Sequence, residues 1–155
     1  MAVPCPFSAA TGDSGSGLKP IVWYYYRQEE AMLDPKLIEI LTTGSDAALT
    51  VVTNGPAGPH LVNTWNSYVT IDGNDLIIPA GGMVHTEENL KRDNTVSLSV
   101  ANRDVMGLRY KGAGMTLYGT ARIEEDGPAF EKIHQHFSWA RAALVITVER
   151  SVQTL

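Results

Sequence analysis

The feature that most constrains this chain is a period of two in its apolar residues, which begins near residue 47 and recurs to the C-terminal end. It is clearest in T-V-S-L-S-V-A, where Val96, Leu98 and Val100 alternate with polar residues. Such alternation is typical of a strand with one buried and one exposed face. Six or seven segments of this kind follow one another without a βαβ rhythm. We therefore expect an antiparallel barrel, of mainly β or α+β class.

The segments between these strands carry turn and helix signals. N-G-P at 54–56 predicts a hairpin with a loop longer than two residues, and D-G-N-D at 72–75 predicts a second hairpin. Asp-Pro followed by an apolar face and a glycine predicts a helix at 34–43. Two further short helices are expected, one at 86–93 and one opened by Asp-Gly-Pro at 126–128.

Composition divides the chain into two parts. Residues 1–20 are rich in Gly, Ser, Pro and Ala, and I-V-W-Y-Y-Y follows at 21–26. We interpret residues 1–30 as an N-terminal extension whose aromatic segment packs over the body of the protein or over a partner chain. Residues 31–155 are expected to form one domain, because this length can bury a core by itself.

Charge and cysteine content exclude several classes of function. The net charge of -5 includes no basic stripe, so we expect no nucleic-acid partner. The single cysteine, Cys5, permits no disulfide within the chain and no thiolate metal cage, and it fits a reducing cytoplasm. His134 and His136 are two residues apart on a helix and point away from each other, so no metal site is expected. No apolar run approaches the roughly 20 residues that cross a membrane.

Three segments carry residues suited to binding chemistry. L-V-N-T-W-N-S-Y at 61–68 is rich in Asn for a strand, so it is either an edge strand entering a turn or a wall against a flat, polar-edged ligand. P-A-G-G-M-V-H-T-E-E-N at 79–89 is either a plain connection or a phosphate site at a helix start. F-S-W-A-R-A-A-L-V-I-T-V at 137–148 supplies aromatic side chains for the core, for a dimer contact or for a ligand.

Taken together, these strings resemble the FMN-binding split-barrel group, which includes pyridoxamine 5′-phosphate oxidase, and within it the small bacterial FMN-binding proteins. The resemblance spans residues 59–155 closely and the helix at 34–43 more loosely. It implies a six-stranded split β-barrel with short peripheral helices. It also implies a homodimer with FMN in the crevice between subunits, and redox chemistry in which no side chain is catalytic.

The resemblance implies three groups of cofactor-binding residues. The flavin ring is expected beside Asn63, Thr64, Trp65, Asn66 and Tyr68. The chain running toward the phosphate, and the phosphate site itself, are expected at Gly81, Gly82, Met83, His85 and Thr86. Trp139 and Leu155 are expected to approach the flavin, one or both from the partner chain.

One position departs from the group. Where the related proteins carry Lys before the phosphate-binding Thr, this chain has His85. Lysine is a fixed cation, whereas histidine exchanges its charge near neutral pH. We therefore expect phosphate binding to weaken as the pH rises, with Arg92 sharing part of the charge.

Three functions are compatible with these residues. The first is an FMN-binding flavoprotein that transfers electrons to an unidentified redox partner or acts as a flavin-dependent oxidoreductase. The second is an oxidase of the pyridoxamine-phosphate type, for which Arg103, Arg109 and Lys111 are the clustered cations that could hold a second phosphate. The third is a non-enzymatic module that binds flavin or haem.

Overall fold

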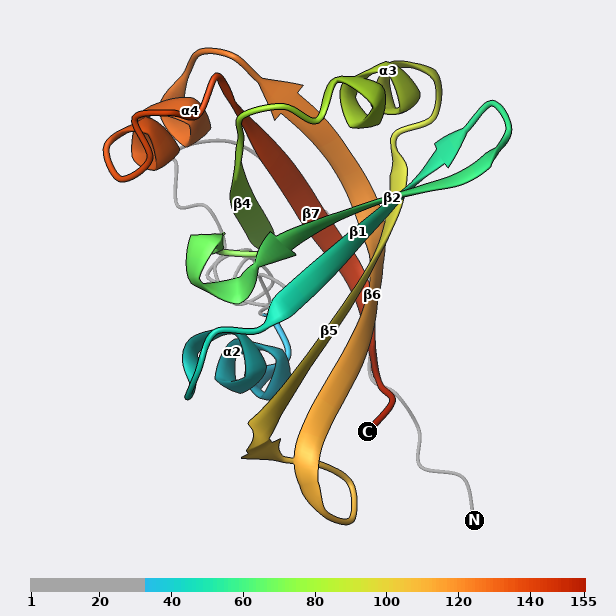
Figure 1. The fold of residues 1–155 in the computed structure, drawn as a ribbon, viewed down its shortest axis with the longest axis vertical. Helices are drawn as coiled ribbons and strands as arrows, with labels where there is room; N and C mark the ends of the chain where they lie inside the picture. The colour runs from blue at the N-terminus through green and yellow to red at the C-terminus, as the bar shows by residue number, and fades with distance from the viewer. Residues whose placement is uncertain (1–32) are drawn as a thin grey trace, which may run out of the picture. The chain divides into compact units, whose positions relative to one another are not determined.

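A computed structural model describes residues 33–155, which form one antiparallel seven-stranded sheet and three α-helices (Figure 1). The predicted N-terminal extension and its I-V-W-Y-Y-Y segment lie outside the described residues. The strands are β1 Ala48–Gly55, β2 Gly58–Trp65, β3 Thr70–Asp72, β4 Asp75–Ala80, β5 Thr95–Met106, β6 Lys111–Glu124 and β7 Ala142–Gln153. The helices are α2 Pro35–Thr42, α3 Val84–Arg92, α4 Pro128–His134 and the 3-10 turn η1 Asn66–Tyr68.

The strand order explains why the barrel is split. Within the sheet the order is β2-β1-β5-β6-β7-β4-β3, so β2 and β3 are the two edges. These edges are consecutive in the chain and are joined only by η1 and Val69. Five chain steps from Trp65 to Thr70 span at most roughly 18 Å. The sheet must therefore curl until its edges approach each other without pairing, and the predicted antiparallel fold class is confirmed.

Two details of the strands differ from expectation. The sheet has seven strands rather than the six that the resemblance implied, because the three residues of β3 form a short edge strand of their own. The first hairpin has a two-residue turn, Pro56-Ala57, so the expected longer loop was wrong. Gly58 has φ of 126°, a backbone conformation that residues other than glycine rarely adopt, and this allows β2 to pair with β1 directly after the turn. The second hairpin has the predicted turn, with Asp72 paired to Asp75.

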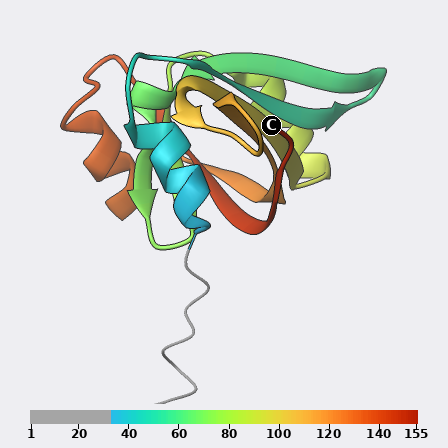
Figure 2. The same cartoon turned by 90° about the horizontal axis from the view of Figure 1, so that it is seen from below.

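Alternation along the strands gives the sheet an inner face that carries the main core. Its fully buried side chains include Leu49, Leu98 and Leu117 on β1, β5 and β6. Helix α2 adds Leu37 and Ile40 to the same cluster and lies against one end of the curled sheet (Figure 2). Helix α4 packs instead on β4 and β7 around a second, smaller cluster. Within residues 33–155, no helix is long and apolar enough to cross a membrane.

The outer face carries large apolar side chains that are exposed to solvent. Strand register places Leu61 beside Val52 and Ser97 beside Tyr118, so one row of side chains crosses β2, β1, β5 and β6 on this face. We define the outer patch as the four exposed apolar residues here: Leu61, Trp65, Tyr118 and Val152. The Arg150 guanidinium lies 3.9 Å from the centre of the Tyr118 ring, beside this patch.

Candidate functional site

The loop between β4 and α3 contains the Gly81-Gly82-Met83 segment and has an unusual backbone. Met83 has φ 60° and ψ 29°, and it is the one residue other than glycine with positive φ among residues 33–155. This left-handed conformation costs about 1–3 kcal/mol and is often found at binding sites. It starts α3 at Val84, two residues before the predicted start, and no side chain caps the first turn. The amide groups of that turn are therefore left free of a side-chain acceptor.

Thr86 lies in this first turn and carries a buried hydroxyl without a partner. The residue is 0% exposed, and among the described residues its Oγ1 makes no hydrogen bond. A buried polar atom in this state costs about 1–3 kcal/mol, so such atoms are rare in folded proteins. This hydroxyl could donate a hydrogen bond to an oxygen of a phosphate group. The observation fits the predicted role of Thr86.

Arg141 holds the loop in place, a role that no motif in its segment indicates. Its Nη2 and Nε donate to the Gly82 carbonyl oxygen at 2.9 and 3.2 Å, and Nη2 also meets Glu87 Oε2 at 2.7 Å. The Arg141 backbone N–H donates to the Ala80 carbonyl oxygen at 2.9 Å. Hydrogen bonds from Lys91 and Arg141 lower the pKa of Glu87. One side chain therefore joins the loop, helix α3 and the start of β7.

An aromatic cluster lies directly over the loop. A Cβ atom on Gly81 would lie 3.1 Å from two carbons of the Trp139 indole, so the ring rests on the glycine backbone. Ring centres of Tyr68, Phe137 and Trp139 are 5.0 to 5.8 Å apart, and Trp139 remains 53% exposed. Tyr68, Gly81 and Trp139 were predicted from three separate segments, and the fold brings them together.

The string N-T-W-N is divided between different environments. Asn63 and Trp65 lie on the outer face, where Asn63 Oδ1 accepts a hydrogen bond from Thr50 Oγ1 at 2.7 Å. Thr64 faces inward and is buried. Asn66 is also buried, and its Oδ1 accepts the Ala47 N–H at 2.8 Å. These four side chains do not line one wall, and that of Asn66 supports the fold.

Leu155 lies at the other end of the molecule from Trp139. Its side chain packs 3.1 Å from the position that a Cβ on Gly114 would occupy, near the β5–β6 hairpin. Strand β7 starts three residues after Trp139, and its 12 residues cover roughly 40 Å before the chain reaches Leu155. Arg103, Arg109 and Lys111 lie at the same hairpin end. Within one chain, none of these residues joins the site around Gly81.

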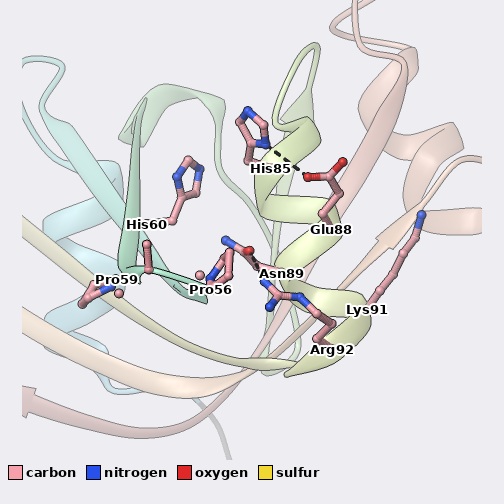
Figure 3. A pocket seen from close by; sticks show the side chains of 11 residues that line it. Pro56, Pro59, His60, His85, Glu88, Asn89, Lys91 and Arg92 are labelled. Atoms are coloured by element: carbon pink, nitrogen blue, oxygen red, sulfur yellow. Dashed lines mark hydrogen bonds and ion pairs between the residues drawn. The ribbon is translucent and has the colours of Figure 1, made fainter.

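His85 lies in a separate pocket, on the side of α3 that faces the β1–β2 turn (Figure 3). Asn89 lines this pocket, although no sequence motif marks it as a binding residue. Asn89 Nδ2 donates to Thr53 Oγ1 at 3.0 Å, and Asn89 Oδ1 accepts from Arg92 Nη2 at 2.7 Å. Asn89 therefore fixes α3 to β1 and orients the Arg92 guanidinium at the pocket.

With this geometry, the chain belongs to the family described as pyridoxamine 5′-phosphate oxidase, which it matches over residues 33–154. Within that class it is 46% identical, over 125 residues, to a protein of Nitratidesulfovibrio vulgaris (strain Miyazaki F) named FMN-binding protein. That alignment covers 80% of this chain and 100% of the relative. The resemblance drawn from the sequence is confirmed.

Solved structures share the fold at much lower identity. The HupZ protein of Group A Streptococcus superposes with a TM-score of 0.64 at 18% identity, covering 79% of this chain and 100% of that one. A candidate pyridoxamine 5′-phosphate oxidase of Listeria innocua gives a TM-score of 0.58 at 21% identity, covering 76% and 94%. At these identities the likeness concerns the fold alone.

Substitution of the two loop glycines should separate ring packing from backbone freedom. Gly81→Ala should push the Trp139 indole aside, change the near-ultraviolet circular dichroism and lower the unfolding free energy by about 1–3 kcal/mol. Gly82→Ala is the matched control, because a Cβ there meets nothing within 4 Å. Equal spectral changes in the two variants would contradict the contact between Gly81 and Trp139.

The hydrogen bonds from Arg141 to Gly82 and Glu87, here called the Arg141 clamp, should stabilise the fold to a degree that depends on pH. Because the pKa of Glu87 is lowered in the fold, its contribution is present above its ordinary value of 4.5 and is lost as the pH falls through the lowered value. Arg141→Gln should reduce the unfolding free energy by about 1–2 kcal/mol at pH 7, and by less at pH 3.5. Urea unfolding at both pH values measures this difference.

Glu87→Gln is the control for this clamp, because it removes the ion pair but leaves the bonds from Arg141 to Gly82. It should show the same pH dependence as Arg141→Gln with a smaller loss at pH 7. A loss in Arg141→Gln that is identical at both pH values would show that the ion pair contributes nothing.

Proposed function

We propose that this protein is an FMN-binding flavoprotein that transfers electrons or acts as an FMN-dependent oxidoreductase. The observation that carries the proposal is the 46% identity to a protein named FMN-binding protein over that protein's whole length. The family match over residues 33–154 contains all three segments selected from the sequence. Bound FMN would supply two-electron or one-electron chemistry at its isoalloxazine ring.

The residues of the β4–α3 loop suit such a cofactor. Uncapped amide groups at the start of α3, together with the unpaired Thr86 hydroxyl, offer donors to a phosphate. Gly81 allows a close approach of the backbone, and the exposed Trp139 ring beside it offers a flat apolar surface. The role of the protein would be to orient the flavin and to exclude water from one of its faces.

We also propose that the protein acts as a homodimer with a site shared between subunits. The outer patch exposes four large apolar side chains on one face of the sheet, which is typical of an interface. Leu155 lies too far from Trp139 to meet a flavin bound there by its own chain. A second copy packed on the outer patch is the arrangement in which Leu155 could contribute as expected.

Oxidation of pyridoxamine phosphate has less support. A second phosphate would need cations next to the flavin, and Arg103, Arg109 and Lys111 lie at the β5–β6 hairpin with Leu155, so they could reach it only across the proposed dimer. Family membership gives the fold and the cofactor class, but it does not extend the substrate of one member to another.

The purified protein should be yellow, with the absorption bands of oxidised flavin and about one FMN per chain. Trp65→Ala should shift the flavin absorbance or its midpoint potential, because in the proposed dimer the outer patch that holds this exposed indole borders the shared site. Trp65→Phe should shift them less. Colourless protein that does not take up added FMN would rule out the proposed function.

Charge placed in the outer patch should separate the dimer. Leu61→Glu is tolerated in a single chain because the side chain is 59% exposed, but it would bury a charge in a subunit interface. Light scattering should give a mass near two chains for the wild type and near one for this variant. Gln135→Glu, on an exposed residue after α4, is the control and should remain dimeric. A monomeric wild type would overturn the dimer.

A further inference from the structure

The hairpin that joins β5 to β6 ends in a turn with a fixed backbone. Met106 pairs with Lys111 at the end of the two strands. Across the turn the Gly107 N–H donates to the Tyr110 carbonyl oxygen at 2.8 Å. A Cβ atom on Gly107 would lie 2.2 Å from the Gly112 carbonyl oxygen, so only glycine fits there. The turn therefore presents its side chains in one arrangement, at the lower end of the sheet in Figure 1.

Three apolar side chains of this hairpin point into solvent. Met106 is 59% exposed, Leu108 67% and Tyr110 80%. Together they offer roughly 400 Å² of apolar and aromatic surface. A stable protein interface buries about 800 Å² on each partner, so this tip is too small to hold another folded chain by itself. It is large enough to enter the headgroup region of a lipid bilayer, where a few apolar side chains and nearby cations give reversible binding.

The cations of the hairpin differ from the other cations of residues 33–155. Ion pairs with carboxylates are made by Lys36, Lys91, Arg122, Lys132 and Arg141. Arg92 bonds to the amide of Asn89. Arg103, Arg109 and Lys111 make no ion pair within the part of the chain that the structure describes. Three cations without a carboxylate partner are therefore gathered at one hairpin.

Two carboxylates lie at the same end and offset part of this charge. Asp104 accepts hydrogen bonds from the N–H and the hydroxyl of Ser45 at 3.1 and 2.8 Å. These bonds, with a smaller effect of the hairpin cations, lower the pKa of Asp104. Glu39 is paired with Lys36, whose Nζ donates to the Met106 carbonyl oxygen at 3.2 Å. Four cations against two carboxylates leave a local excess of two positive charges, in a chain whose net charge is -5.

We propose that the β5–β6 hairpin docks on an anionic lipid surface, with Leu108 and Tyr110 in the headgroup region and Arg109 and Lys111 beside the lipid phosphates. The charge of the occupant follows from the local positive excess, which attracts an anionic bilayer. Its form follows from the small protruding tip, because a bilayer needs no recess to receive it. Such a contact requires no membrane-spanning segment, and neither bound FMN nor the proposed dimer enters the argument.

Sedimentation with vesicles tests this docking. Full-length protein is mixed at pH 7 with vesicles of phosphatidylcholine alone, or of phosphatidylglycerol and phosphatidylcholine in a one-to-two ratio. The protein should sediment with the mixed vesicles and remain in solution with phosphatidylcholine alone. Raising the salt concentration from about 0.1 M to about 1 M should release it, because the Debye length falls from about 10 Å to about 3 Å.

Variants assign the binding to the hairpin. Arg109→Gln combined with Lys111→Gln should weaken the partition onto the mixed vesicles by about 25-fold, because each cation near an anionic surface contributes about 5-fold. Leu108→Ser should weaken it by roughly 10-fold, because apolar area is lost from the headgroup region. Arg122→Gln combined with Lys132→Gln is the matched control. It removes the same charge from the far end of β6 and from α4, and it should bind as the wild type does.

Three results would overturn the proposal. The first is a wild-type protein that binds neither kind of vesicle, or both equally, and this is also the result expected if the hairpin serves an acidic protein instead. The second is wild-type binding in both hairpin variants. The third is a change of mass of Leu108→Ser in light scattering, which would show that the tip is buried between subunits. Circular dichroism checks each fold, and either hairpin variant carries the test if the other does not fold.

Discussion

The arrangement of this protein depends on two hydrogen bonds between Asn66 and Ala47. The Asn66 N–H donates to the Ala47 carbonyl oxygen at 2.9 Å, and Asn66 Oδ1 accepts the Ala47 N–H at 2.8 Å. This pair fixes the point where the chain leaves edge strand β2 and enters η1. The short passage to β3 then forces the sheet to curl, and it brings Tyr68 to Phe137 and Trp139, which lie in the segment between α4 and β7. The connection that curls the sheet therefore also brings the aromatic residues of the site together.

Much of the fold could be predicted because it follows from local sequence patterns, namely apolar alternation and turn residues. Alternation located β5, β6 and β7, and D-G-N-D identified the turn between β3 and β4. The first hairpin was misjudged because its length depends on the backbone of Gly58 rather than on residue type alone. Likewise, α3 begins earlier than expected because Met83 adopts a left-handed conformation that sequence rules rarely assign to methionine.

Site residues could be predicted where a single segment contains the side chains that suit a ligand. They could not be predicted where the role of a residue depends on a contact with a residue far away in the sequence. Gly81 and Trp139 could be selected from their segments, although their contact could not. Arg141 acts on Gly82, which is 59 residues away, and Asn89 acts on Thr53, which is 36 residues away. His60 contacts His85, with 5.9 Å between the ring centres, and the strand pattern does not predict where the helix that carries His85 lies. The placement of Asn63 and Trp65 on one face and Thr64 on the other follows from strand alternation, so it could have been predicted from the sequence.

Strand β2 separates two kinds of surface, with His60 on one side and Trp65 on the other. Because consecutive residues of a strand point to opposite sides, a single inserted or deleted residue between them would reverse one set relative to the other. The pocket imidazole and the outer indole could not then both keep their places. The stretch from His60 to Trp65 should therefore tolerate substitutions better than insertions or deletions, because only a change of length alters which side of the strand each residue faces.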